Sequence, residues 1–144
     1  MKPLPHRYDV RLTGGPTGYA TLSGPGLPEL RSAPPPEYDG PGDAWSPEHL
    51  LLASVAACFL YTLRAVARAS KVEFESLDLA TEGTLDRVDG VTRFTELVLR
   101  PRLRVGPGGD PARIRWVLEK SKKSCLVTAS LAAPVRLEPE IAGV

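Results

Sequence analysis

The sequence is poor in cysteine and histidine, the residues on which small secreted scaffolds and zinc sites depend. Its 144 residues include two cysteines, Cys58 and Cys125, and two histidines, His6 and His49. Two cysteines cannot make a framework of several disulfides, and no pair among the four residues has the spacing of zinc ligands. The sequence therefore predicts no metal site, and any disulfide between the two cysteines is expected to be transient and redox-active.

The chain also lacks an excess of either charge. Its 18 basic and 17 acidic side chains give a formal net charge of +1, and it contains no RNA-recognition, zinc-finger or phosphate-binding motif. We therefore expect no nucleic-acid partner. The N-terminus, MKPLPHRYDV, has neither the apolar region nor the cleavage site of a secretory signal, which favours a cytoplasmic location.

Long apolar runs are missing as well. Residues 50–63 carry no charged side chain, but these 14 residues fall short of the roughly 18 to 20 that cross a membrane. Polar Ser54 and Thr62 also interrupt the run. The sequence therefore predicts a buried helix here and no membrane span.

The composition that remains is that of a soluble globular chain, with 42% hydrophobic and 24% charged residues. The length suits one domain with a substantial core, so residues 1–144 are expected to form a single domain. Prolines and glycines divide the first third, where residues 8–12, 18–22 and 30–32 are predicted strands of a small meander. Residues 33–43, APPPEYDGPGD, are predicted to be an ordered surface loop.

A long helix is predicted to begin after Ser46 and to run to Ala69. Ser46 can cap it, Pro47 suits the first helical position, and Glu48 complements the dipole in the first turn. The helix is apolar around most of its circumference, so it needs packing partners on more than one side. This pattern adds an oligomer to the prediction.

The remaining elements predict an α+β fold with an antiparallel sheet. Residues 72–87 and 91–105 alternate apolar with polar side chains around Asp89-Gly90, a strong hairpin signal. Pro101 places the second arm at a sheet edge or beside a bulge. A second helix follows Asp110 and Pro111, then a short helix near Cys125 and a final strand in PVRLEPEI.

Each cysteine has two possible roles at this point. Cys58 lies in the middle of the long helix, where a free cysteine is most often a small hydrophobic residue of the core. Cys125 follows the lysine-rich stretch KSKKS and begins a predicted short helix. Both features would lower a thiol pKa, although a lysine run at a helix end is usually a solvated surface.

These residues together resemble the OsmC/Ohr family, the osmotically inducible protein C and organic hydroperoxide resistance proteins. The resemblance rests on WSPEHLLLASVAACF, with a Pro-Glu pair at the helix start and Cys58 ten residues after Glu48. A second cysteine follows 67 residues later in EKSKKSCLVTASL. The similarity extends over nearly the whole chain, including the order of the elements.

The resemblance implies an intertwined homodimer, in which two strongly bent antiparallel sheets surround a pair of central helices. It also implies reduction of organic hydroperoxides, with Cys58 as the peroxidatic and Cys125 as the resolving cysteine. The resulting disulfide is reduced by a dithiol such as a lipoyl group. Trapping the sulfenic acid as a disulfide protects it from irreversible oxidation. No cofactor is expected.

The chain departs from the family at the arginine that pairs with the residue matching Glu48 and activates the cysteine. The two family positions for this arginine hold Pro16 and Tyr38, and the sequence does not choose between Arg11 and Arg31 as a substitute. Cys58 gains nothing from the dipole of its own helix, and burial raises a thiol pKa, so it is expected to need a cation.

Helix geometry assigns Glu48 to a different thiol from the one on its own helix. Ten residues separate it from Cys58, about 15 Å along a helix and about 80° around it. If Glu48 serves a thiol site, we expect that site to hold the Cys58 of the partner subunit. A plain charge at a helix N-terminus is the alternative.

Two functions remain open. The first is a thiol peroxidase with Cys58, Cys125 and Glu48 in its site. The second is a non-catalytic protein of the same fold that binds a small apolar ligand at the dimer interface. Aromatic side chains near the thiol in sequence, Trp45, Phe59 and Tyr61, would line such a pocket, although at least one is expected in the core. Trp116 is expected to anchor the second helix, and His49 to lie on the surface.

Overall fold

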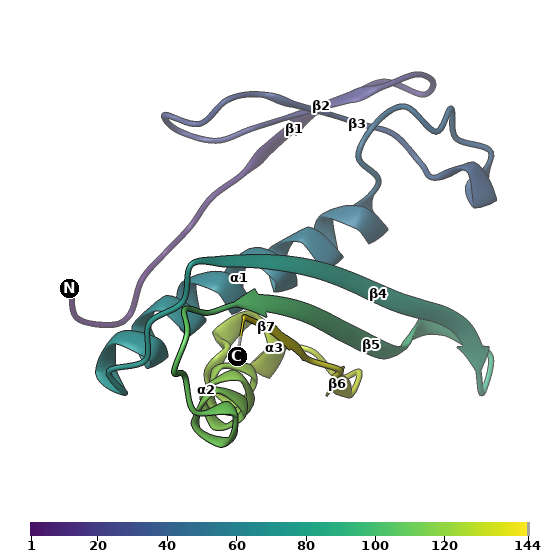
Figure 1. The fold of residues 1–144 in the computed structure, drawn as a ribbon. Coiled ribbons are helices and arrows are strands. Elements are labelled where there is room, and N and C mark those ends of the chain that lie inside the picture. The colour runs from purple at the N-terminus through teal and green to yellow at the C-terminus, as the bar shows by residue number, and fades with distance from the viewer. Residues whose placement is uncertain (144) are drawn as a thin grey trace. The chain divides into compact units, whose positions relative to one another are not determined.

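The computed structural model describes residues 1–143 and divides the chain into two compact units (Figure 1). The N-terminal unit is Met1–Leu51, and the C-terminal unit begins at Leu52 and includes every described residue after it. The first long helix, α1 (Pro47–Ala69), begins in the N-terminal unit and contributes residues 52–69 to the C-terminal unit. The expectation that residues 1–144 form a single domain stays a prediction.

The N-terminal unit contains a three-stranded antiparallel sheet. Its strands are β1 (Arg11–Thr13), β2 (Ala20–Ser23) and β3 (Leu30–Ser32), in the order β1-β2-β3. The third strand has the predicted bounds. The first two begin two to three residues later than predicted, because the pairing starts where Arg11 lies opposite Ser23 and leaves Tyr8 and Val10 exposed outside the sheet.

The loop after β3 is ordered, as predicted, and includes the short 3-10 helix η1 (Pro36–Tyr38). Two bonds close its ends: Ser32 Oγ donates to the Trp45 carbonyl at 2.7 Å, and the Ala33 N–H donates to the same oxygen at 3.2 Å. Gly40 is required inside the loop, since a Cβ there would lie 1.6 Å from the Pro34 carbonyl oxygen.

The C-terminal unit is built on a long hairpin of β4 (Ser76–Val88) and β5 (Val91–Arg104). The turn has the predicted position, with φ of 51° at Asp89 and 77° at Gly90, the left-handed values that a two-residue hairpin turn requires. The register shifts between Thr84 and Leu85, which marks a bulge.

Two short strands complete this sheet where the sequence predicts one. They are β6 (Val135–Leu137) and β7 (Glu140–Ala142), and both pair parallel with β5. The predicted antiparallel pairing is confirmed for β4 and β5 and wrong for β6 and β7. The chain passes through α2 and α3 before it returns to β5, and parallel strands need such a crossover connection.

Pro101 lies on the central strand β5, so its predicted place at an edge or a bulge is also wrong. The N–H groups of Leu97 and Val105 donate toward the β6 and β7 side. Because residues of one strand that differ by an even number point the same way, the Pro101 nitrogen faces that side too. It faces the break between β6 and β7, where no donor is needed.

The helices have the predicted starts. Ser46 Oγ accepts the His49 N–H at 3.1 Å at the beginning of α1. Asp110 Oδ1 accepts the Ala112 N–H at 3.0 Å at the beginning of α2 (Pro111–Ser124). The predicted short helix is α3 (Leu126–Ala129), which follows α2 after one residue.

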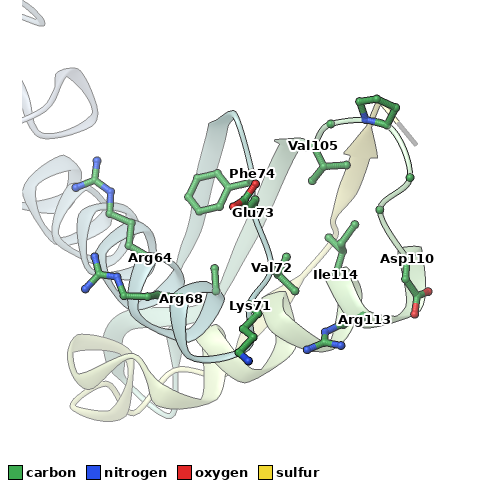
Figure 2. Close-up of a pocket in the computed structure, with 15 residues that line it drawn as sticks. Arg64, Arg68, Lys71, Val72, Glu73, Phe74, Val105, Asp110, Arg113 and Ile114 are labelled. Atoms are coloured by element: carbon green, nitrogen blue, oxygen red, sulfur yellow. The ribbon is translucent and has the colours of Figure 1, made fainter.

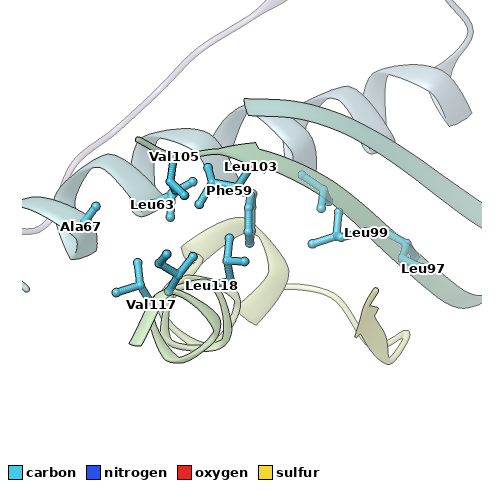
Figure 3. Close-up of a cluster of buried hydrophobic side chains, with 11 residues drawn as sticks. Phe59, Leu63, Ala67, Leu97, Leu99, Leu103, Val105, Val117 and Leu118 are labelled. Carbon is cyan, nitrogen blue, oxygen red and sulfur yellow. The ribbon is translucent and has the colours of Figure 1, made fainter. Parts of the chain in front are cut away.

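The core of the C-terminal unit lies between one face of the sheet and the helices α1 and α2 (Figure 3). Every second residue of β5 near its end faces this core, while Arg100, Arg102 and Arg104 lie exposed on the opposite face. On α1 the buried residues recur every four positions, which is one stripe of a helix. The central side chains are Val55, Phe59, Leu63, Leu97, Leu99, Leu103, Val117 and Leu118, all at 0% exposure.

Within the described residues, α1 is the one helix whose length and mean hydropathy of 1.9 match a membrane span. The core helix of a globular protein passes the same test, and the buried stripe of α1 packs against the sheet and α2. Only 22% of the apolar window is buried inside the chain. The expectations of no membrane span and of an oligomer both stay predictions.

Candidate active site

The structure brings the two cysteines together inside the C-terminal unit. Cys58 lies on α1 beside the buried stripe, one residue before Phe59, and is half-buried. Cys125 ends α2 and caps α3, with an extended backbone at φ −69° and ψ 114°, and is 1% exposed. Both thiols are free, and a hydrogen bond joins their side chains.

The surroundings of Cys58 favour its thiolate. Burial raises the pKa of Cys58, but hydrogen bonds from the Val127 N–H, the Cys125 thiol, the Thr62 hydroxyl and the Leu126 N–H outweigh burial and hold the pKa below its ordinary value. The sulfur lies 3.9 Å from Thr62 Oγ1. Only the thiolate attacks electrophiles, so these contacts favour the reactive form of Cys58.

The two amides that face Cys58 belong to the first turn of α3. The first N–H groups of a helix have no carbonyl partner inside it, so they are free to donate to an anion. A cation was expected beside Cys58 because the dipole of its own helix does not favour the thiolate. The short helix near Cys125 was predicted, but its position over Cys58 was missed because no local pattern links residues 67 positions apart.

Thr62 was also missed, although the sequence contains a signal for it. Residues four apart on a helix lie one above the other, so the spacing of Cys58 and Thr62 on α1 predicts their contact. The Thr62 hydroxyl thus places a hydrogen-bond donor beside the Cys58 sulfur.

The surroundings of Cys125 favour its neutral thiol. Burial raises the pKa of Cys125; the Thr128 hydroxyl and N–H lower it, and the neighbouring Cys58 raises it, with a raised pKa as the net result. Of the two possibilities left open for the lysine run, the structure favours the solvated surface, because no lysine contributes to the pKa of Cys125. Lys122 pairs with Glu119 at 3.4 Å and Lys123 is exposed, while the thiol faces inward.

Thr128 has a second notable property. Its Oγ1 atom is buried and has no partner of ordinary hydrogen-bond geometry within the described part of the chain, yet the Thr128 side chain lowers the pKa of Cys125. An anion on the Cys125 sulfur would give this hydroxyl a charged acceptor.

Glu48 belongs to the N-terminal unit, so its predicted place in a thiol site stays a prediction. Among residues 1–143, its Oε2 atom is buried without a hydrogen-bond partner. Glu48 lines a cavity of about 450 Å³ within this unit, together with Tyr38, which occupies one family arginine position. The other lining residues are mostly apolar: Leu12, Gly18, Ala20, Ser32, Ala33, Pro34, Pro35 and Pro47.

The two arginines that the sequence left open do not line this cavity. Arg31 pairs with Asp43 at 3.8 Å and stacks over the Tyr19 ring at 4.2 Å. Tyr19 donates to the same carboxylate at 2.8 Å, and this bond raises the pKa of Tyr19. Arg11 is exposed on β1. Arg31 is therefore engaged within its own unit.

The other candidate residues take simple places. His49 is exposed, and its Nδ1 lies 2.7 Å from Ser46 Oγ, so it belongs to the helix cap. Phe59 lies in the core, as expected for at least one of the aromatic side chains near Cys58 in sequence. Tyr61 is 60% exposed. Trp116 is 55% exposed in this chain, so its expected role as an anchor of α2 is wrong. Within residues 1–143, no cluster of three or more acidic, histidine or cysteine side chains has the arrangement of a metal site.

Comparison with known proteins settles the family. Residues 40–140 match the family model of OsmC-like proteins. The chain belongs to the OsmC family. This OsmC-like chain is 32% identical over 116 residues to the organic hydroperoxide resistance protein of Xanthomonas axonopodis pv. citri, an alignment that covers 78% of each chain. It is 29% identical over 96 residues to the peroxiredoxin OsmC of Escherichia coli, covering 67% of this chain and 66% of that one.

The fold is shared with solved OsmC-like structures. The structure of an OsmC-like protein of unknown function from Vibrio cholerae superposes with a TM-score of 0.86, at 16% identity, over 94% of this chain and 99% of that one. The mixed α+β architecture of the chain is therefore that of OsmC-like proteins.

Proposed function

We propose that this OsmC-like protein is a thiol peroxidase that reduces organic hydroperoxides with Cys58 as the nucleophile and Cys125 as the resolving cysteine. The observation that carries the proposal is the contact between two thiols whose pKa values are displaced in opposite directions. A pair of titratable groups driven apart by their surroundings divides a reaction into two roles. The names of the curated relatives in Xanthomonas and Escherichia coli agree with this chemistry.

In the first step the Cys58 thiolate attacks one peroxide oxygen. A sulfur–oxygen bond forms and the oxygen–oxygen bond breaks, so the sulfur loses two electrons and becomes a sulfenic acid. The alkoxide leaves, takes a proton from solvent and becomes the alcohol. The α3 amides and the Thr62 hydroxyl stabilise the negative charge of the attacking Cys58 sulfur, which is the role that a cation would otherwise have.

In the second step the Cys125 sulfur attacks the oxidised Cys58 sulfur. A disulfide bond forms and the sulfur–oxygen bond breaks; the hydroxide that leaves takes the Cys125 proton and becomes water. The buried Thr128 hydroxyl is placed to donate to Cys125 as its proton departs. A small dithiol, possessing two thiols like a lipoyl group, then restores both cysteines by exchange and is itself oxidised to a disulfide.

The site is proposed to be completed in an intertwined homodimer with bent sheets around central helices. Two features support this assembly: only 22% of the apolar window of α1 is buried in one chain, and Glu48 has a buried oxygen without a hydrogen-bond partner among residues 1–143. A donor from a second copy would satisfy that oxygen. The proposed setting is the cytoplasm, where dithiols keep the two cysteines reduced.

The proposal is tested by mixing the reduced protein with cumene hydroperoxide and titrating the free thiols over time. We expect both thiols to be lost together with formation of an intramolecular disulfide. Cys125→Ser should instead accumulate over-oxidised Cys58, and Cys58→Ser should lose the reaction. A reaction no faster than that of free cysteine would contradict the proposal.

A second candidate function is binding of a small apolar ligand without catalysis. The apolar cavity of about 450 Å³ beside Glu48 favours it. In this case the reduced protein would bind an apolar probe such as cumyl alcohol, and Cys58→Ser and Cys125→Ser would bind it equally well. Peroxide would then leave the thiol content unchanged.

A further inference from the structure

The C-terminal unit contains a second cavity that neither cysteine lines. Its volume is about 910 Å³, within the range of small-molecule sites. It lies between the end of α1, the segment that leads into β4, the loop after β5 and the beginning of α2 (Figure 2). We call it the basic basin.

Four cations surround the basic basin: Arg64 and Arg68 on α1, Lys71 after α1, and Arg113 on α2. Figure 2 shows Arg64 and Arg68 on α1 and Arg113 on α2, with Lys71 between these two helices. Within residues 1–143, none of the four forms an ion pair, whereas Arg100, Arg102 and Arg136 on the sheet all do. The rim therefore carries positive charge that the chain does not neutralise by contact.

Two carboxylates also line the basic basin, and they do not cancel this charge. Asp110 already accepts the Ala112 N–H as the cap of α2. Glu73 is the other, so four cations face two carboxylates. Between the charges the wall includes Val72 and Phe74, two partly exposed apolar side chains that pack against the hydrophobic core, and beneath them Val105 and Ile114 are buried.

Capping of α1 explains only part of this arrangement. Arg113 donates to the Ser70 carbonyl, and the Lys71 and Val72 N–H groups close the helix end on Arg68 and Ala67. Lys71 occupies the left-handed position of this motif, with φ of 55°, where glycine or asparagine is preferred. A lysine in this conformation is strained, and the helix end does not require its side chain.

We propose that the basic basin binds an amphipathic organic anion, a carboxylate with an aliphatic tail. The carboxylate pairs with the rim cations and the tail lies on the apolar wall. This site is separate from the thiol chemistry and does not depend on it.

The test is an NMR titration of the full-length protein with octanoate, following the amide signals of Val72, Val105 and Ile114. Octylammonium has the same tail with the opposite charge, and inorganic phosphate has charge without a tail. We expect saturable shifts with octanoate and none with the other two at the same concentrations. Binding of octylammonium or phosphate as tight as that of octanoate would overturn the proposal.

Variants separate the effect of the Lys71 charge on binding from the role of Lys71 at the end of α1. Lys71→Gly removes the charge and relieves the strained backbone, so it should weaken octanoate binding about fivefold while leaving the melting temperature no lower. Arg68→Gln should weaken binding by a similar factor. Lys123→Gln removes an exposed lysine of α2 outside the basin and should bind like the unaltered protein. Unchanged octanoate affinity in both Lys71→Gly and Arg68→Gln would contradict the site.

Discussion

Cys58 and Cys125 are in contact, yet they occupy opposite environments. Cys58 is half-buried and receives hydrogen bonds from two amides, a hydroxyl and a thiol. Cys125 is 1% exposed, and burial dominates its surroundings. The short helix α3 gives two identical side chains different properties. Its first N–H groups donate to Cys58, whereas Cys125, the residue at its N-terminal cap, is buried.

The largest expected effect is on alkylation, because it compares the two thiols one at a time. At neutral pH, iodoacetamide should modify Cys58 in Cys125→Ser on the order of 100-fold faster than it modifies Cys125 in Cys58→Ser, since both thiolate fraction and exposure differ. Mass spectrometry after timed quenching gives both rates. Equal rates would show that the two environments do not differ in solution.

Stability should separate the same two variants. Cys125→Ser places a hydroxyl in a fully buried site and is expected to lower the free energy of unfolding by about 1 to 2 kcal/mol. Cys58→Ser changes a half-buried position and should cost less than about 1 kcal/mol. Urea denaturation of the reduced proteins measures both, and a larger loss in Cys58→Ser would contradict the assigned burial.

Thr62 allows a finer test of the Cys58 environment. Thr62→Val keeps the shape of the side chain and removes a hydrogen bond to the thiolate, so the pKa of Cys58 should rise. At neutral pH the reaction with peroxide should slow about threefold to tenfold. Thr62→Ser keeps the hydroxyl and is the matched control. At high pH, where Cys58 is fully ionised, the two variants should react alike; a deficit that persists there would indicate a different role for Thr62.

The smallest expected effect is the pH dependence of stability. The folded state lowers the pKa of Cys58, so between the folded and unfolded pKa values the unfolded chain binds more protons, and stability rises with pH. This contribution is complete above the unfolded pKa and is lost as pH falls through the folded pKa. For Cys125, with a raised pKa, the contribution is present below the unfolded pKa and is lost as pH rises through the folded one.

Urea denaturation across the alkaline range, from about pH 7 to 10, compares the unaltered protein with Cys58→Ser. The stability difference between them should grow in favour of the unaltered protein as pH increases toward the ordinary thiol pKa. A difference that shrinks with pH would reverse the sign assigned to Cys58.

Local signals in the sequence predicted much of the fold. Ser46 and Pro47 fix the start of α1, and Asp89-Gly90 fixes the hairpin turn, because caps and tight turns depend on neighbouring residues. The parallel pairing of β6 and β7 with β5 was not predictable, since it depends on where the chain returns after two helices.

Some residues of the candidate site could also be predicted from the sequence, and others could not. The resemblance to the OsmC/Ohr family identified the two cysteines. It did not identify the donors to Cys58, because Leu126 and Val127 reach it through the tertiary fold and their backbone amides leave no mark in the sequence. Thr62 was within reach of a helical-spacing argument. Glu48 was identified through its match to the family glutamate, and its Oε2 atom has no hydrogen-bond partner among residues 1–143.

We propose that Cys58 ionises at lower pH than Cys125 and therefore acts as the nucleophile. An NMR titration of the cysteine side-chain signals in the reduced protein tests it directly, since each thiol is observed separately. The signal of Cys58 should titrate below the ordinary thiol range and that of Cys125 above it. Titration in the reverse order, or of both thiols at the ordinary pKa, would contradict the account.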